Sequence, residues 1–168
     1  IGYTGQNWST KVNLTNVHAR HVQIKASDGL TTQNIGGLVG WIGVGGGDTW
    51  LENCSAEDIH ITGYQAGGLV GQLVGGRGCK FTNCWTEDVE VRMTFLSYAS
   101  GFIGSINNGA GSKLVDCKAP ARVVYLDDKT GEIKTNYRGE PYEPESEFYG
   151  SCGGTDIVIE TTTGTTEP

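Results

Sequence analysis

The segment Gly37-Leu38-Val39-Gly40 decides the fold, because it returns as Gly68-Leu69-Val70-Gly71 and again as Gly101-Phe102-Ile103-Gly104. These copies begin 31 and 33 residues apart. Two weaker copies flank them: Gly2-Tyr3-Thr4-Gly5, and a degraded one that ends at Phe148-Tyr149-Gly150. A period of this length is typical of a repeat architecture, in which each repeat is one supersecondary unit that stacks on its neighbours.

Two further units accompany the glycine units. The first is centred on Asn or Asp and follows each glycine unit by about ten residues, as Leu14-Thr15-Asn16-Val17, Leu51-Glu52-Asn53-Cys54, Phe81-Thr82-Asn83-Cys84 and Leu114-Val115-Asp116-Cys117. The second alternates apolar and polar residues, as Val22-Gln23-Ile24, Ile59-His60-Ile61 and Val89-Glu90-Val91. Such alternation is typical of a strand with one buried face, so each repeat carries three short strand signals.

The same pattern excludes a helical repeat. No stretch keeps apolar residues at the i, i+3, i+4, i+7 spacing, and each of the 27 glycines among 168 residues would oppose a helix by about 1 kcal/mol relative to alanine. Three short strands joined by glycine- and asparagine-rich turns are what one coil of a parallel β-helix needs. The sequence therefore predicts an all-β fold, a right-handed parallel β-helix (β-solenoid) of about four coils.

In such a fold, equivalent residues of successive coils form ladders along the axis, because the strands stack about 4.8 Å apart. Two ladders are predicted to point inward: Leu14, Leu51, Phe81 and Leu114 on one wall, and Leu38, Leu69 and Phe102 on another. A third ladder, Asn16, Asn53, Asn83 and Asp116, marks a corner that demands the left-handed backbone conformation, which Asn and Asp tolerate. Paired glycines serve the other corners, where a positive φ or a close backbone approach is required.

The predicted domain is residues 1–160, cut from a longer chain, and residues 161–168 form a Thr-rich linker. One insertion, 125–146, breaks the period. It is predicted to hold a hairpin with arms 123–126 and 132–135, and either to form a recognition loop or to act as a lid on the side of the coils.

The alternation of Gly-Gly-Leu-Val-Gly with Asn-Cys and a following strand resembles the GLUG-motif repeat family. The resemblance covers about residues 2–124 and returns faintly at 147–159. The family occurs in bacterial secreted and surface proteins, including haemagglutinin-like adhesins and the non-catalytic regions of some immunoglobulin-cleaving metallopeptidases. It implies a bacterial, extracellular β-solenoid, at the cell surface or secreted, and it implies no activity because a scaffold defines the family.

Charge limits the partners. With 12 Lys and Arg against 19 Asp and Glu, the net charge is −7, so no basic face is expected to neutralise nucleic-acid phosphates or an anionic membrane. The longest uncharged run, between Asp28 and Asp48, is interrupted by glycines and does not predict a membrane span. No cofactor is expected. The remaining candidates are a host protein, a glycan and neighbouring domains of the parent chain.

Cysteines and carboxylates each leave two alternatives. Cys54, Cys84 and Cys117 share one ladder position with Val17, which indicates buried thiols, although a disulfide between adjacent coils has a suitable spacing. Acidic residues also align on neighbouring coils, at Glu57, Asp58, Glu87 and Asp88. Paired carboxylates of this kind either bind Ca²⁺ or form a solvated acidic stripe, and no other metal site is indicated.

The sequence favours a protein that is not an enzyme. It has no His-Glu-x-x-His motif, and no base–orienter pair is evident around His18, His21 and His60. Gly150-Ser151-Cys152-Gly153-Gly154 is similar to a nucleophile turn, but its phase places it at a corner of the repeat. Chemistry of the polysaccharide-acting kind known on β-helices stays open as a minor alternative.

Binding is expected on outward residues and on the insertion, because these are free to specialise in a solenoid. Alternation turns two indoles outward, and these can stack on sugar rings, anchor a protein or pack against a loop. The candidate ligand-binding residues are Trp50, Trp85, Tyr125, Tyr137, Arg138 and Tyr142. The leading hypothesis is an extracellular adhesion or binding module for a host protein or glycan. The alternatives are a structural spacer or stalk, and an accessory non-catalytic region of a secreted peptidase.

Overall fold

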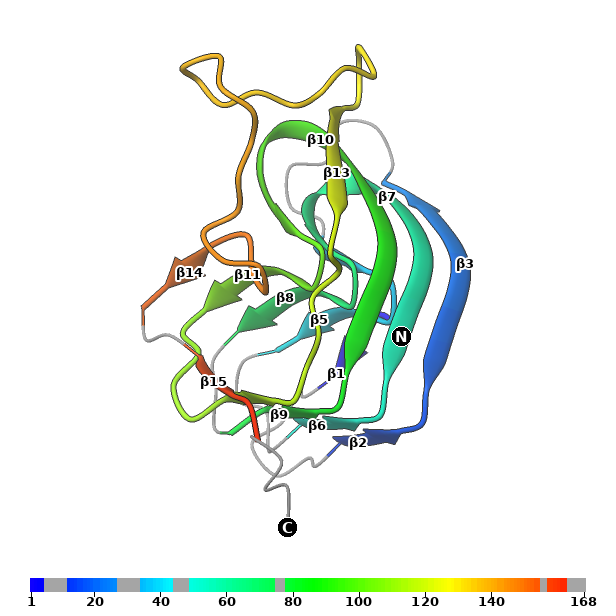
Figure 1. The fold of residues 1–168 in the computed structure, drawn as a ribbon, viewed down its shortest axis with the longest axis vertical. Coiled ribbons are helices and arrows are strands. Elements are labelled where there is room, and N and C mark those ends of the chain that lie inside the picture. The colour runs from blue at the N-terminus through cyan, green and yellow to red at the C-terminus, as the bar shows by residue number, and fades with distance from the viewer. Residues whose placement is uncertain (5–11, 27–33, 44–48, 75–77, 155–156, 163–168) are drawn as a thin grey trace, which may run out of the picture.

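The computed structural model describes residues 1–4, 12–26, 34–43, 49–74, 78–154 and 157–162, and for 94–97 it describes the backbone alone. Within these residues the protein is all-β and has no helix, so no helix is long and apolar enough to cross a membrane. Figure 1 shows the strands gathered into sheets, with the segment between β13 and β14 projecting beyond them at the top of the view.

Three sheets, each of parallel strands, make up the described fold. Sheet A has the order β1 (Tyr3–Thr4), β5 (Val39–Ile42), β8 (Val70–Val74), β11 (Ile103–Asn107) and β14 (Cys152–Gly153). Sheet B has the order β2 (Val12–Thr15), β6 (Thr49–Glu52), β9 (Lys80–Thr82), β12 (Lys113–Val115) and β15 (Val158–Glu160). Sheet C has the order β3 (His18–Lys25), β7 (Ser55–Gly67), β10 (Trp85–Ser100) and β13 (Val123–Asp127), and β4 (Asn34–Gly36) pairs with the end of β7.

The chain visits sheets A, B and C in the same order in successive repeats, and each strand pairs with its equivalent in the next repeat (Figure 1). The predicted ladders are in register. Leu14 pairs with Leu51, Leu51 with Phe81, and Phe81 with Leu114. Leu51, Phe81 and Leu114 are fully buried, as are Leu69 and Phe102 of the other ladder, while Leu38 is 5% exposed. The core therefore lies between the three sheets.

The corner between sheets B and C has the predicted left-handed backbone. The φ values of Asn16, Asn53, Asn83 and Asp116 lie between 51° and 57°. The amide of each residue donates to the carbonyl oxygen of the next repeat, as in the 2.9 Å bond from Asn53 N to Thr82 O. A short polar side chain tolerates this conformation, so one residue turns the chain while the parallel stacking continues.

The glycine corners arise from close approach of the backbone. None of the glycines in the repeated Gly-Φ-Φ-Gly units at 37–40, 68–71 and 101–104 is among the positive-φ glycines of the described chain. A Cβ on Gly71 would instead lie 2.5 Å from Gly40 O and 2.7 Å from the carbonyl carbon of Asn34. The backbone of β8 at Gly71 thus packs directly on the backbone of β4 and β5 in the preceding repeat, and any side chain would separate them.

Strands β7 and β10 are longer than their sequence signals, with 13 and 16 residues. A second left-handed position, at His21, Asp58 and Asp88 with φ between 51° and 54°, bends each long strand of sheet C before the alternating segment. The three residues are equivalent between repeats, because Val22, Ile59 and Val89 follow them in paired register. A bend that recurs at the same position of each repeat changes the direction of the flanking side chains, as a β-bulge does.

The insertion leaves sheet C later than the sequence suggests. Val123–Asp127 pairs with Val89–Met93 of β10 and so belongs to the sheet, whereas the insertion was placed from Tyr125. Alternation does not reveal this strand, because the outward position between Val123 and Tyr125 is held by the apolar residue Val124. The hairpin itself is confirmed: Asp127 N donates to Glu132 O, and Leu126 forms an antiparallel bridge with Ile133.

None of the five cysteines, all of which lie in the described chain, is in a disulfide. Cys54 and Cys84 are buried and Cys117 is half-buried, which agrees with the expectation of buried thiols. A hydrogen bond with the Cys117 thiol, together with burial, raises the pKa of the Cys84 thiol. Cys84 therefore stays protonated and packs as a small apolar side chain.

Candidate functional site

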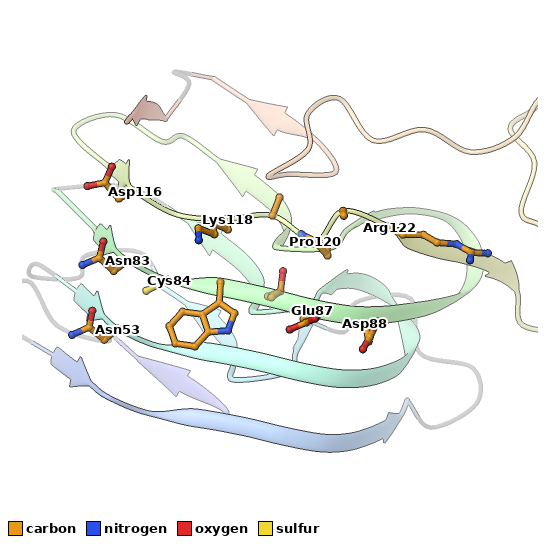
Figure 2. A pocket seen from close by; sticks show the side chains of 13 residues that line it. Asn53, Asn83, Cys84, Glu87, Asp88, Asp116, Lys118, Pro120 and Arg122 are labelled. Atoms are coloured by element: carbon orange, nitrogen blue, oxygen red, sulfur yellow. The ribbon is translucent and has the colours of Figure 1, made fainter. Parts of the chain in front are cut away.

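A groove of about 750 Å³ runs along the outer side of sheet C, and Trp85 lies in it. We call it the Trp85 groove. Its walls come from three successive repeats, and its main polar lining residues are Asn53, Asn83, Asp116, Glu87, Asp88, Lys118 and Arg122. Figure 2 shows Asn53, Asn83 and Asp116 at one end of the groove and Arg122 at the other.

The position of Trp85 follows from the corner beside it. Asn83 turns the chain with a φ of 51°, Cys84 then points into the core, and alternation turns Trp85 outward at the start of β10. The equivalent residue one repeat earlier is Ser55, which leaves space beside the indole. Beyond Ser55, the His18 ring lies 5.5 Å from the Trp85 ring between centroids. The indole is therefore held on one side and half-buried.

Proline opens the groove on the other side of Trp85. Trp85 forms a bridge with Lys118, and Thr86 N donates to Lys118 O at 3.2 Å. Regular pairing with β10 resumes only between Val123 and Val89. Val123 follows Lys118 by five positions, whereas Val89 follows Trp85 by only four, so this segment has one extra residue relative to β10. Pro120 lies within the segment and has no N–H to donate. The segment 119–122 therefore leaves the sheet and forms a wall of the groove.

One buried hydroxyl in the groove lacks a partner. Thr86 is only 4% exposed, and its Oγ1 makes no hydrogen bond within the described structure. Thr86 pairs in register with the core residue Ala56, so its side chain faces the interior. The polar groups that the groove presents beside Trp85 therefore come from its exposed lining residues.

The charges along the groove are mixed. Asp116 accepts hydrogen bonds from Thr162 N and Oγ1 at 2.7 and 2.5 Å, and these bonds lower the pKa of its carboxyl group. Lys118, Arg122, Glu87 and Asp88 are exposed. An aromatic surface surrounded by amides, carboxylates and cations suits a ligand with many hydroxyl groups, because a sugar stacks its C–H face on the ring and bonds to the polar groups.

The other predicted indole is elsewhere. Trp50 lies on β6, in sheet B, between Asn13 and Lys80 of the neighbouring strands, and 45% of it is exposed. Its outward direction agrees with the alternation. The structure nevertheless places Trp50 and Trp85 on different sheets, so they do not share a groove.

Two of the three candidate tyrosines pack the insertion against the sheets. The rings of Tyr125 and Tyr142 meet edge to face with centroids 5.0 Å apart, and burial raises the pKa of both phenols. The Tyr142 hydroxyl donates to Ala99 O and accepts from Ala99 N, each at 3.0 Å. The insertion therefore contacts the sheets through Tyr142, whose hydroxyl bonds to the backbone of Ala99 in β10.

The third candidate tyrosine is at the exposed tip of the insertion. Tyr137 is 79% exposed, and the Arg138 guanidinium lies 5.2 Å from the centroid of its ring. Tyr137 and Tyr142 both line a second groove of about 760 Å³ between the insertion and the sheets. The candidate residues therefore divide between the Trp85 groove, sheet B and the insertion.

Two of the four aligned carboxylates, Glu57 and Asp58, are engaged with basic and polar side chains. Glu57 and Glu87 pair in register as expected. Glu57 accepts from Ser55 Oγ at 2.9 Å and lies 3.1 Å from Arg20 Nε, and these partners lower the pKa of its carboxyl group. Asp58 is similarly held by two histidines, while Glu87 and Asp88 are exposed. Within the described chain no three His, Cys, Asp or Glu residues gather as a metal site.

Sequence reasoning missed a histidine–carboxylate cluster. His21 Nδ1 lies 2.7 Å from one oxygen of Asp58, and His60 Nε2 lies 3.2 Å from the other. The hydrogen bond from His21, followed by that from His60, lowers the pKa of Asp58. The sequence holds a signal for this cluster, because His21 and Asp58 are separated by 37 residues, the length of one repeat. His18 and Ser55 have the same separation. All three cluster residues are partly or largely exposed on sheet C.

A scan against models of known families, a search of curated proteins and a search of solved structures each found no match to this chain.

Proposed function

We propose that the three parallel sheets are the walls of a right-handed β-helix of about four coils, of the kind found in GLUG-motif repeats. The repeated visiting order of the sheets and the unbroken register from Leu14 to Leu114 support this. Right-handed winding follows from the strong preference of parallel strand crossovers for that hand. As in that family, the protein would act outside a bacterial cell, as a surface or secreted module.

We further propose that the module is a non-enzymatic adhesion domain that binds a glycan in the Trp85 groove. The observation that carries this is the half-buried Trp85 indole among amide, carboxylate and basic side chains, in a groove large enough for a short oligosaccharide. Binding pockets of about 300–1,000 Å³ are usual for small ligands. A parallel sheet supplies a rigid support, so little ordering is needed on binding.

The test is a titration of the protein with a panel of neutral and acidic oligosaccharides, followed by NMR at the Trp85 indole N–H. We expect saturable binding that Trp85→Ala abolishes. Trp50→Ala is the matched control, because it removes the same side chain from another sheet, and we expect it to bind normally. Circular dichroism checks that both variants are folded, so that a loss of binding can be assigned to the missing indole.

Two outcomes contradict the proposal. If a bound glycan is unaffected by Trp85→Ala, the site lies elsewhere. If no saccharide binds at millimolar concentration, the repeats are better explained as a spacer that holds another domain away from the cell, or as an accessory region of a secreted peptidase.

A further inference from the structure

The groove beneath the insertion has a different chemistry from the Trp85 groove. We call it the insertion groove. It measures about 760 Å³ and includes Tyr98, Tyr137, Glu140, Glu143 and Glu145 in its lining. A smaller cavity of about 300 Å³ adjoins it and shares Tyr98 and Glu145. The two cavities are therefore neighbours, one lined by the insertion and the other by residues of β8 and β11.

The insertion groove is anionic. Three carboxylates line it, and the one lysine in its lining, Lys134, is already neutralised by Asp127, whose Oδ2 lies 2.6 Å from Lys134 Nζ. Glu145 accepts a hydrogen bond from Cys152 N and Glu140 accepts one from Asn136 Nδ2, so both carboxylates are fixed in direction. Within the described residues no Lys, Arg or His forms an ion pair with Glu140, Glu143 or Glu145, so their charge can attract a cationic guest.

The aromatic rings of the groove suit the same guest. Tyr98 is 44% exposed and Tyr137 is 79% exposed. The negative face of an aromatic ring attracts ammonium and guanidinium groups. The chain itself shows this preference, because the Arg138 guanidinium lies over the Tyr137 ring.

The adjoining cavity adds a polar group that lacks a partner. Ser105 is 4% exposed, and its Oγ has no hydrogen-bond partner within the described structure. It lines the cavity together with the amides of Gln65 and Gln72. Amide and hydroxyl groups of this kind pair with the N–H and C=O groups of an extended peptide, whereas a carboxylate alone would not distinguish a peptide from a simple cation.

We propose that the insertion groove binds an extended, basic peptide segment, with lysine or arginine side chains between the tyrosines and glutamates and with the peptide backbone against Ser105. This goes beyond glycan binding and does not depend on it, because the two grooves share no residue. The protein would then hold a saccharide and a basic protein segment at separate sites.

The probe is a hexalysine amide or hexaarginine amide peptide, titrated into the full chain by calorimetry and followed by NMR. We expect saturable binding, with shifts at the backbone amides of Tyr98 and Ser105. Glu143→Gln and Tyr137→Leu should each lower the affinity for the peptide by about fivefold or more, since each removes one partner of the cation. Glu132→Gln, an exposed residue outside the groove, makes the same charge change as Glu143→Gln and should leave the affinity unchanged.

Equal weakening by Glu132→Gln and Glu143→Gln would overturn the proposal, because it would show attraction to the net charge of the protein alone. So would an absence of saturable binding, or shifts confined to residues outside the groove. Trp85→Ala should bind the peptide normally. A loss of glycan binding alone therefore leaves this inference intact, and a loss of peptide binding alone leaves the glycan proposal intact.

Discussion

At the scale of single residues, burial alternates sharply along β6. Leu51 is fully buried between Leu14 and Phe81, whereas its neighbour Glu52 is exposed. We expect Leu51→Asp to abolish cooperative folding, at a cost of about 4 kcal/mol or more, because it places an unpaired charge in the core. Urea titration followed by circular dichroism measures this. Glu52→Lys is the control and should stay within about 0.5 kcal/mol of the parent protein; a folded Leu51→Asp variant would contradict the register.

The residue scale is where the sequence was most informative. Leu51 and Asn53 are recognisable because each occupies a position with the same requirement in every repeat. The Leu51 position is buried, and the Asn53 position has a left-handed backbone. Asp58 and Asp88 also have a left-handed backbone. The sequence does not reveal this, because solvation of the carboxylate explains an Asp at an outward position equally well. The contacts of His21 and His60 with Asp58 required the register, which single residues do not carry.

At the scale of elements, the glycine corners depend on space. A Cβ on Gly71 would meet only backbone atoms, which cannot move aside without separating two strands. We expect Gly71→Ala to destabilise the protein by about 1–3 kcal/mol, the usual cost of overpacking, or more. Gly2→Ala is a matched control, because nothing lies within 4 Å of its Cβ position. Thermal unfolding compares the two, and equal midpoints would show that the close approach is absent in solution.

The hairpin of the insertion is an element with its own pH dependence. Lys134 Nζ bonds to Asp127, the backbone amides of Thr130 and Lys129 donate to the same carboxylate, and together they lower the pKa of Asp127 to about 2. A depressed folded-state pKa gives stability that is fully present above the unfolded value near 3.9 and is lost as the pH falls toward 2. We expect NMR signals of Ile133 and Lys134 to shift toward unfolded values between about pH 4 and pH 2. Asp127→Asn should remove this transition, and its persistence in that variant would assign the transition to another group.

Elements were less predictable than residues where the period changes. The hairpin was found from its turn residues, yet the start of the insertion was misplaced because Val124 stands where other repeats have a polar residue. The Trp85 groove could not be read from the chain. It depends on one extra residue between Lys118 and Val123 and on Pro120. In the sequence these two features show only that the repeat is irregular at this point.

At the scale of the whole molecule, stability should vary from the central strands of each sheet to its edge strands. Strands β7, β8, β9 and β10 each have a paired strand on both sides, whereas β2, β3 and β15 have one. In repeat architectures each unit is stabilised mainly by its nearest neighbours, so opening begins at the ends. The side chains agree: Leu14 at one end of its ladder is half-buried, and Ile159 at the other is 45% exposed, while Leu51 and Phe81 between them are fully buried.

This gradient has a direct measurement in native-state hydrogen exchange. We expect the amides of β7 and β10 to exchange only through global unfolding, and those of β3 to exchange through local opening that is easier by about 1 kcal/mol or more. Asp58 lies in β7 and contacts His21 in β3, so Asp58→Asn should lower protection at β3 and leave β10 unchanged, since the contact joins only the first two repeats. Uniform protection across β3, β7 and β10 would instead mean that these strands of sheet C open as a single cooperative unit, and that nearest-neighbour contacts do not grade their stability.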